Sequence, residues 1–71
     1  MAMKLLVIIE RGRRNYGAYS PDLPGCIATA RTRAAVVRRM RAAIRFHIEG
    51  LKRRGLAVPK PSTAARILDV A

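Results

Sequence analysis

Four basic side chains recur in the middle of the chain at steps of three, four and seven residues: Arg38, Arg41, Arg45 and Lys52. On a helix, side chains at these steps lie along one face, so the four would form a row of positive charge. Guanidinium groups bind phosphates and carboxylates through paired hydrogen bonds. The row therefore predicts contact with an acidic partner such as RNA or DNA, with a merely solvated helix face as the alternative.

The net charge agrees with this interpretation. The chain of 71 residues carries 15 Lys+Arg against 4 Asp+Glu, a formal charge of +11 at pH 7. A charge this large favours nucleic acid, an anionic surface or an acidic protein as the partner. Few aromatic side chains are present to stack on bases, namely Tyr16, Tyr19 and Phe46. Binding to nucleic acid would therefore be mostly electrostatic and would weaken steeply with salt.

Residues with catalytic potential are few and dispersed. His47 is the only histidine and Cys26 the only cysteine, so neither an intrachain disulfide nor a cysteine-based metal site is expected. Acid–base or metal-dependent hydrolysis needs acids that converge at one point. The four acidic residues are scattered along the chain: Glu10, Asp22, Glu49 and Asp69. We expect no enzyme, no metal site and no cofactor.

Residues 20–26, Ser-Pro-Asp-Leu-Pro-Gly-Cys, form what we call the corner. Pro21 and Pro24 each fix φ and lack an N–H, so this stretch cannot lie within a central strand. Asp22 can accept hydrogen bonds from nearby backbone amides, and Gly25 can adopt a positive φ. The corner is therefore stiff. It is either an ordinary rigid turn between strands or a preorganised recognition surface.

The rest of the chain supplies a sheet and a helix. Residues 3–10 contain the continuous apolar run 5–9, typical of a strand that is covered on both faces or placed centrally in a sheet. Residues 15–20 and 26–30 alternate as two further strands, with Cys26, Ala28 and Ala30 on one face of the last. Short connections predict an antiparallel three-stranded meander.

The periodicity then becomes helical over residues 33–54, with Thr32 as N-cap and Gly55 as the glycine after the helix end. Its apolar positions form one stripe that would pack on the sheet: Val36, Val37, Met40, Ala43, Ile44, Ile48 and Leu51. The basic row would lie opposite. After a proline-containing linker, residues 66–70 are a short last strand that either returns along the sheet or pairs with a neighbouring chain.

The predicted fold is therefore a single α+β domain over residues 1–71, arranged β-β-β-α-β with the helix on one face. A core with so few aromatic side chains is thin, so we expect a homo-oligomer. No apolar run approaches the ~20 residues of a membrane span. We expect a cytoplasmic protein without contact to a membrane.

Residues 15–29, from Asn-Tyr-Gly-Ala-Tyr through the corner to Ile-Ala-Thr, resemble the HicB-like antitoxin family. The likeness continues through Thr32, the segments 42–44 and 47–51, Gly55 and the prolines of 59–62, and so covers nearly the whole chain. The resemblance implies a partial, degraded RNase H-type fold and assembly as a dimer or tetramer. It also implies that the protein neutralises a HicA-like toxin, a small enzyme that cleaves mRNA.

Two family properties do not carry over. Leu6-Val7-Ile8 offers no carboxylate at the centre of the first strand, so no RNase H activity is implied. Many members add a C-terminal DNA-binding segment, and we expect this chain to be a short form without it.

Two functions follow from the sequence. In the first, the chain is an antitoxin that occludes an mRNA-cleaving toxin, and its rigid corner makes the contact through Tyr19, Pro21, Asp22, Leu23 and Pro24. In the second, it is a solitary basic module that binds nucleic acid through the helical row of Arg38, Arg41, Arg45 and Lys52.

Overall fold

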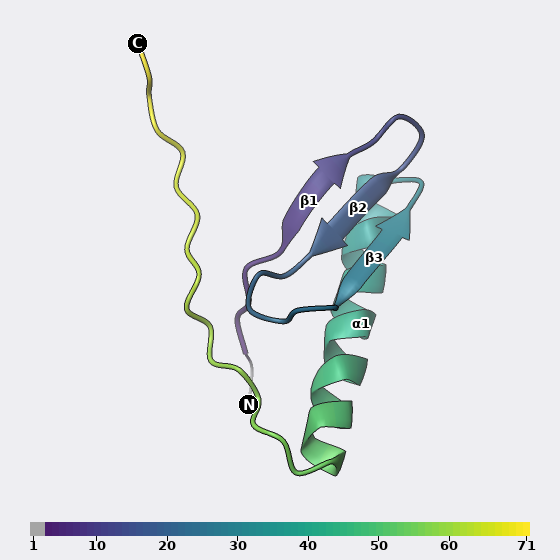
Figure 1. The fold of residues 1–71 in the computed structure, drawn as a ribbon. Coiled ribbons are helices and arrows are strands. Elements are labelled where there is room, and N and C mark those ends of the chain that lie inside the picture. Colours follow the sequence, from purple (N-terminus) through teal and green to yellow (C-terminus); the bar gives the residue numbers. More distant parts are fainter. Residues whose placement is uncertain (1–2) are drawn as a thin grey trace.

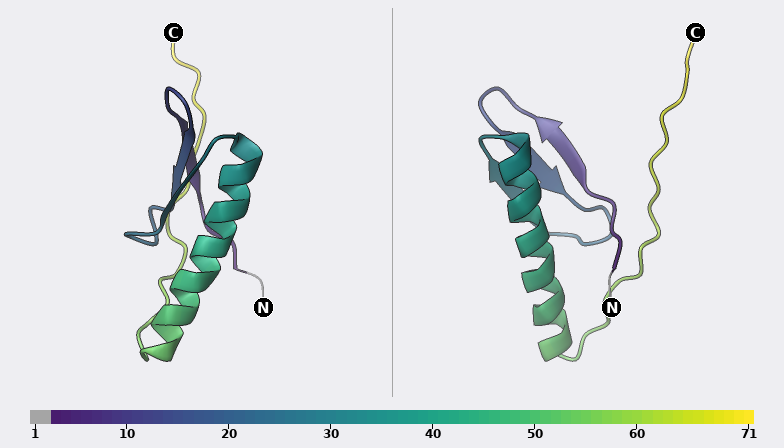
Figure 2. Two further views of the ribbon diagram at one scale, coloured as in Figure 1. Left: turned by 90° about the vertical axis from the view of Figure 1, so that its right-hand side faces the viewer. Right: turned by 180° about the vertical axis from the view of Figure 1, so that it is seen from behind.

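The computed structural model describes residues 3–71 and contains three strands followed by one long helix (Figure 1). The elements are β1 (Ile8–Arg11), β2 (Tyr16–Tyr19), β3 (Ile27–Ala30) and α1 (Arg33–Arg53). The strands form one antiparallel sheet in the order β1-β2-β3, and α1 lies across one face (Figure 2). The predicted α+β fold with an antiparallel meander is confirmed.

The first strand is shorter than predicted. In β1 the residue Ile8 is paired with Tyr19, and the pairing ends at Arg11 opposite Tyr16. Residues 3–7 form no strand because β2 ends at Tyr19, where the corner turns the chain away. Moreover, β1 lies at an edge of the described sheet and not at its centre. The apolar run that predicts a central strand is thus placed on an edge.

Strand alternation places side chains on the two faces as predicted. The face toward α1 carries Ala18 and Ala30, both buried, together with the half-buried Ile9. The opposite face carries Tyr19 and Ile27, which are paired across β2 and β3 and remain exposed. Directly paired residues point to the same face of a sheet, so this outer face holds the exposed Tyr19 and Ile27 together with the half-buried Ile8.

Both ends of α1 form as the sequence indicates. The Thr32 hydroxyl accepts a 3.1 Å hydrogen bond from the Ala35 amide, which caps the first turn. At the other end, Gly55 has φ +67°, the left-handed region that favours glycine. The Gly55 amide donates to the Lys52 carbonyl and the Leu56 amide to the Leu51 carbonyl, a Schellman arrangement.

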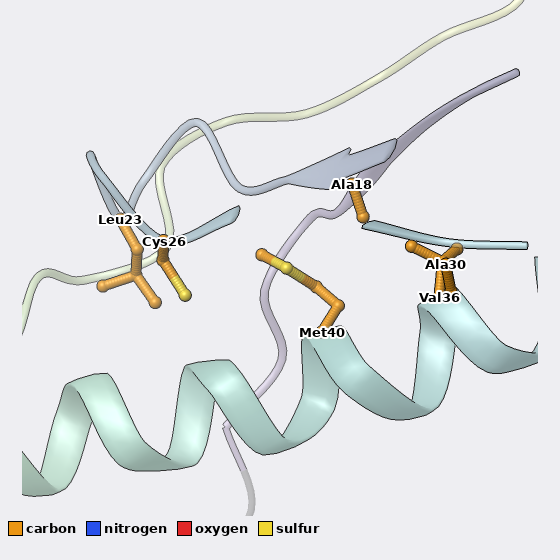
Figure 3. Close-up of a cluster of buried hydrophobic side chains, with 6 residues drawn as sticks. All are labelled: Ala18, Leu23, Cys26, Ala30, Val36 and Met40. Carbon is orange, nitrogen blue, oxygen red and sulfur yellow. The ribbon is translucent and has the colours of Figure 1, made fainter. Parts of the chain in front are cut away.

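Six buried apolar side chains form the core between the sheet and the helix (Figure 3): Ala18, Leu23, Cys26, Ala30, Val36 and Met40. Val36 and Met40 belong to the predicted helical stripe, and the remaining stripe positions are half-buried. Leu23 comes from the corner, which therefore closes one end of the core. Three of the six are alanine or cysteine side chains without a branch, so the core is thin.

The chain after α1 does not form the predicted fourth strand. Residues 56–71 run as extended chain along the β1 side of the molecule and separate from the sheet (Figures 1 and 2). The Cα radius of gyration is 13.7 Å, whereas a compact domain of this length has about 11 Å. Residues 66–70 therefore pair with no strand within residues 3–71, because this segment runs clear of the free edge of β1.

Candidate partner-binding surface

The corner is held from within by a buried side chain and short backbone hydrogen bonds. The Leu23 amide donates to the Ser20 carbonyl and the Cys26 amide to the Leu23 carbonyl, both at 3.1 Å. Gly25 has φ +84°, which lets the chain reverse into β3. The Ser20 hydroxyl, itself buried, donates 2.9 Å to the Leu6 carbonyl and so joins the corner to the chain that precedes β1. The corner is thus rigid in its position as well as in its shape.

Asp22 ties the corner to the C-terminal part of the chain, and we call this contact the Asp22 anchor. Its carboxylate accepts hydrogen bonds from the hydroxyls of Ser62 (3.0 Å) and Thr63 (2.8 Å). It also accepts from the backbone amides of the same two residues, each at 3.3 Å. The hydrogen bond from the Thr63 hydroxyl is the main cause that lowers the pKa of Asp22. Desolvation opposes it, and the Ser62 hydroxyl and both amides lower the pKa further.

The structure separates the five predicted contact residues into two groups. Tyr19, Pro21 and Pro24 are exposed, the tyrosine at the end of β2 and the two prolines on the corner. Leu23 is only 1% exposed and packs in the core, and the Asp22 carboxylate is engaged by the chain's own Ser62 and Thr63. In this conformation, the side chains of Tyr19, Pro21 and Pro24 are therefore accessible to a partner.

An apolar row on the outer face of the sheet lies next to the corner. Tyr19 in β2 is paired with Ile8 on one side and Ile27 on the other, so the three side chains cross the sheet together. Tyr19 is 38% and Ile27 68% exposed. Sequence reasoning did not assign Ile8 or Ile27 to a site. The available indication was alternation in β3, which puts Ile27 opposite Cys26, Ala28 and Ala30.

The predicted basic residues of the helix are all exposed: Arg38, Arg41, Arg45 and Lys52. The row does not lie opposite the apolar stripe, however. Arg41, Arg45 and Lys52 border a groove between α1 and the N-terminal segment that is lined by the half-buried Val37, Ile44 and Ile48. The sheet covers only part of the apolar stripe of the helix. The basic row therefore flanks the part of the stripe that the sheet leaves uncovered.

This groove has a volume of about 1330 Å³. One wall is α1, and the other is formed by Leu5, Val7 and Ile9 of the chain leading into and through β1. It exists because α1 packs mainly against β3 and β2, which leaves its β1 side uncovered.

The residues with catalytic potential are not assembled into a site. Cys26 is buried, and desolvation raises the pKa of its thiol, which is protonated and unreactive at neutral pH. His47 is half-buried on the helix. Among residues 3–71, no three His, Cys, Asp or Glu side chains gather closely enough to hold a metal ion. Within the same residues no helix is long and apolar enough to span a membrane.

The protein is a small α+β domain with a three-stranded meander and one capped helix on its face. The Pro-Asp-Leu-Pro-Gly corner closes one end of its core. The chain belongs to the HicB-like antitoxin family of bacterial toxin–antitoxin systems, whose family model matches residues 5–70. No curated protein and no solved structure matches the chain. The resemblance stated from the sequence is thereby confirmed, and membership implies an antitoxin role with a toxin as partner.

Proposed function

We propose that this chain is an antitoxin that binds a HicA-like mRNA-cleaving toxin and neutralises it by covering its RNA-binding or catalytic surface. The observation that carries the proposal is the family match over residues 5–70, which includes both the corner and the helix. Its role is binding and not catalysis. The chain acts as a homo-oligomer, a dimer or a tetramer, because its thin core and uncovered groove leave apolar surface to be buried.

The toxin contact is assigned to the outer face of the sheet and the corner. Tyr19, Pro21 and Pro24 are exposed there, and Ile8 and Ile27 extend the surface across the strands. Aromatic and branched apolar side chains dominate the centre of protein interfaces. The corner is already ordered by the buried Leu23, so binding costs little conformational entropy at this position.

The proposal is tested by the affinity of the purified chain for a HicA-like toxin and by inhibition of the toxin's RNA cleavage. We expect Tyr19→Ala and Ile27→Ala each to weaken toxin binding about tenfold or more, as central interface positions do. Phe46→Ala is the matched control, because Phe46 is also a large exposed side chain but lies on α1. Unchanged affinity in both sheet variants, with the helix intact, would remove this surface from the proposal.

The prediction that Leu23 contacts the partner is not tested by the loss of toxin binding in a Leu23 variant. Replacing Leu23 removes a core side chain, so a loss of toxin binding would report unfolding and not a lost contact. Asp22→Asn tests the anchor instead, since it keeps a similar shape and removes the charge. Pro21→Ala and Pro24→Ala test the exposed part of the corner.

A second function is favoured by the four exposed basic residues on one helix. In this alternative, Arg38, Arg41, Arg45 and Lys52 bind the phosphates of RNA or DNA. Fluorescence anisotropy with a labelled duplex at ~50 mM salt gives the strongest expected signal, since backbone-driven affinity falls steeply with salt. Absence of binding under these conditions would exclude the function.

The matched pair for this experiment carries equal changes of charge. Arg41→Glu with Arg45→Glu alters the helical row, whereas Arg13→Glu with Arg14→Glu alters the exposed turn between β1 and β2. A specific row predicts loss of duplex binding in the first variant only. Equal losses would show that the net charge of +11 attracts nucleic acid without a defined site.

A further inference from the structure

Three features of the fold are unsatisfied in the single chain, and they share one side of the molecule. The free edge of β1 has no neighbouring strand among residues 3–71. The groove between α1 and the N-terminal segment exposes apolar side chains. The segment 64–71 is extended, pairs with nothing in the sheet, and carries Ile67, Leu68 and Val70 in the open. Figure 1 shows that this segment runs clear of the sheet on the β1 side.

We propose that two copies of this chain exchange their segments 64–71, each segment adding a strand to the β1 edge of the other copy and covering its groove. This inference deepens the homo-oligomer of the proposed function and does not depend on the identity of the toxin. It gives the assembly a mechanism, strand addition at a free sheet edge.

The sequence of β1 supports a missing neighbour. The apolar run 5–9 covers the chain leading into β1 and its first two residues, Ile8 and Ile9, and is typical of a strand buried on both faces, yet β1 lies at the edge. Exposed edges with long apolar strands invite pairing with another chain. A strand added beside β1 would make it central, which is the environment that its composition indicates.

The segment has the side chains for this position. Ile67 is 98% and Val70 90% exposed, values that leave both side chains almost wholly in water. In an extended strand, Leu68 and Val70 share one face and Ile67 lies on the other. Whichever face meets the groove, the opposite face continues the outer face of the sheet, where Ile8 is its neighbour across β1. Both faces of the segment therefore gain apolar contacts.

The charges of the segment and the groove are complementary. Residues 64–71 contain one basic and one acidic residue, Arg66 and Asp69, so the segment is neutral in a chain of net charge +11. These two positions lie on opposite faces of a strand. The groove offers an opposite charge to either one, because Glu49 stands among its basic residues Lys4, Arg41, Arg45 and Lys52.

Exchange between copies is favoured over return to the chain's own sheet by the anchor. Ser62 and Thr63 are fixed to Asp22, and the segment leaves that point directed away from its own β1. Each copy then has both a free β1 edge and an unpaired segment 64–71. Two copies related by a two-fold axis each supply the segment that pairs with the other's edge.

The decisive measurement is the molar mass in solution, by light scattering or sedimentation, of the full chain without toxin. We expect Ile67→Asp and Leu68→Pro each to weaken self-association about 100-fold or more, since each change occurs twice in a two-fold dimer. Leu68→Pro removes an N–H that a strand ladder uses, without adding charge. Both residues are exposed in the single chain, so circular dichroism should show the helix unchanged.

Phe46→Asp is the matched control, an exposed apolar residue on α1 away from the proposed contact, and its self-association should remain as in the parent chain. A second readout is an isotope-filtered NMR experiment on a mixture of labelled and unlabelled chains. Contacts between residues 66–70 and β1 should appear between chains. A monomeric parent, assembly that survives Ile67→Asp and Leu68→Pro, or contacts found only within one chain would each overturn the exchange. Toxin binding, measured separately on Leu68→Pro, keeps a failure here distinct from a failure of the toxin proposal.

Discussion

The Thr63 hydroxyl donates a 2.8 Å hydrogen bond to the Asp22 carboxylate, joining residues 41 positions apart in the sequence. Together with the contacts from Ser62, it makes the corner the fixed point from which the C-terminal chain departs. The carboxylate thus has a structural use within the chain itself. It sets where the segment 64–71 begins, while Pro21 and Pro24 beside it are exposed.

The anchor predicts a dependence on pH with a definite sign. Hydrogen bonds, foremost that from Thr63, hold the pKa of Asp22 below its ordinary value of 3.8. Because the folded pKa is lowered, the anchor's contribution is complete above the ordinary pKa and is lost as the pH falls through the lowered value. We expect the amide resonances of Ser62 and Thr63 to move toward random-coil positions only as the pH falls below 3.8.

Asp22→Asn is the control for this titration. The variant keeps one carbonyl oxygen to accept from the hydroxyls but has no proton to gain, so the same resonances should show no transition in this range. A transition of equal size in the variant would mean that another group releases the segment, and the anchor would not be its cause.

The glycines near the end of α1 predict opposite effects for one substitution. Gly55 has φ +67°, so Gly55→Ala should destabilise the protein by about 1 kcal/mol. Gly50 lies inside the helix with open space where a Cβ would stand, so Gly50→Ala should stabilise by up to about 1 kcal/mol. Urea titrations of both variants measure the two changes. If both substitutions changed the free energy of unfolding in the same direction, the Schellman ending of the helix would be contradicted.

The N-cap residue Thr32 predicts a loss of stability when its hydroxyl is removed. Thr32→Ala removes the acceptor of the Ala35 amide, and we expect a cost of about 1 kcal/mol in the free energy of unfolding. Thr32→Ser retains the hydroxyl and should restore most of it. The first turn of α1 carries no acidic residue, so no other side-chain carboxylate there replaces the cap. A serine variant as unstable as the alanine variant would point to packing of the threonine methyl instead.

Local features of the sequence were sufficient for most of the fold. Thr32 and Gly55 bound the helix at the predicted residues because capping depends on the side chain and backbone of the cap itself. The alternation in β2 and β3 identified their inner faces, since a strand has a period of two. The corner and its flanking residues carried the resemblance to the family, which the match over residues 5–70 confirms.

What the sequence did not reveal depends on contacts between distant residues. The burial of Leu23 follows from how the corner folds under the sheet, and hydrophobicity between two prolines does not distinguish a core residue from an exposed one. The use of Asp22 as an anchor requires Ser62 and Thr63 to return to it over 40 and 41 positions. The last strand did not form because the segment 66–70 runs clear of the free edge of β1, and its place relative to that edge depends on the whole fold.

Leu23 provides the sharpest test of the corner as part of the core. Leu23→Ala removes a fully buried side chain from a thin core and should cost about 2–5 kcal/mol. A domain of this size is stabilised by only about 4–11 kcal/mol, so the variant should lose much of its cooperative unfolding transition. Leu23→Met keeps the volume and should cost less than about 1.5 kcal/mol.

Thermal unfolding followed by circular dichroism compares the two Leu23 variants with Ile27→Ala, which shortens an exposed side chain on the outer face. The expected order of stability is Ile27→Ala closest to the parent, then Leu23→Met, then Leu23→Ala. The contrast matters for function because toxin binding should follow a different order, with Ile27→Ala weakened and Leu23→Met nearly unaffected. If Leu23→Ala kept the parent's unfolding temperature but lost toxin affinity, Leu23 would be a contact residue in solution and the corner would open on binding.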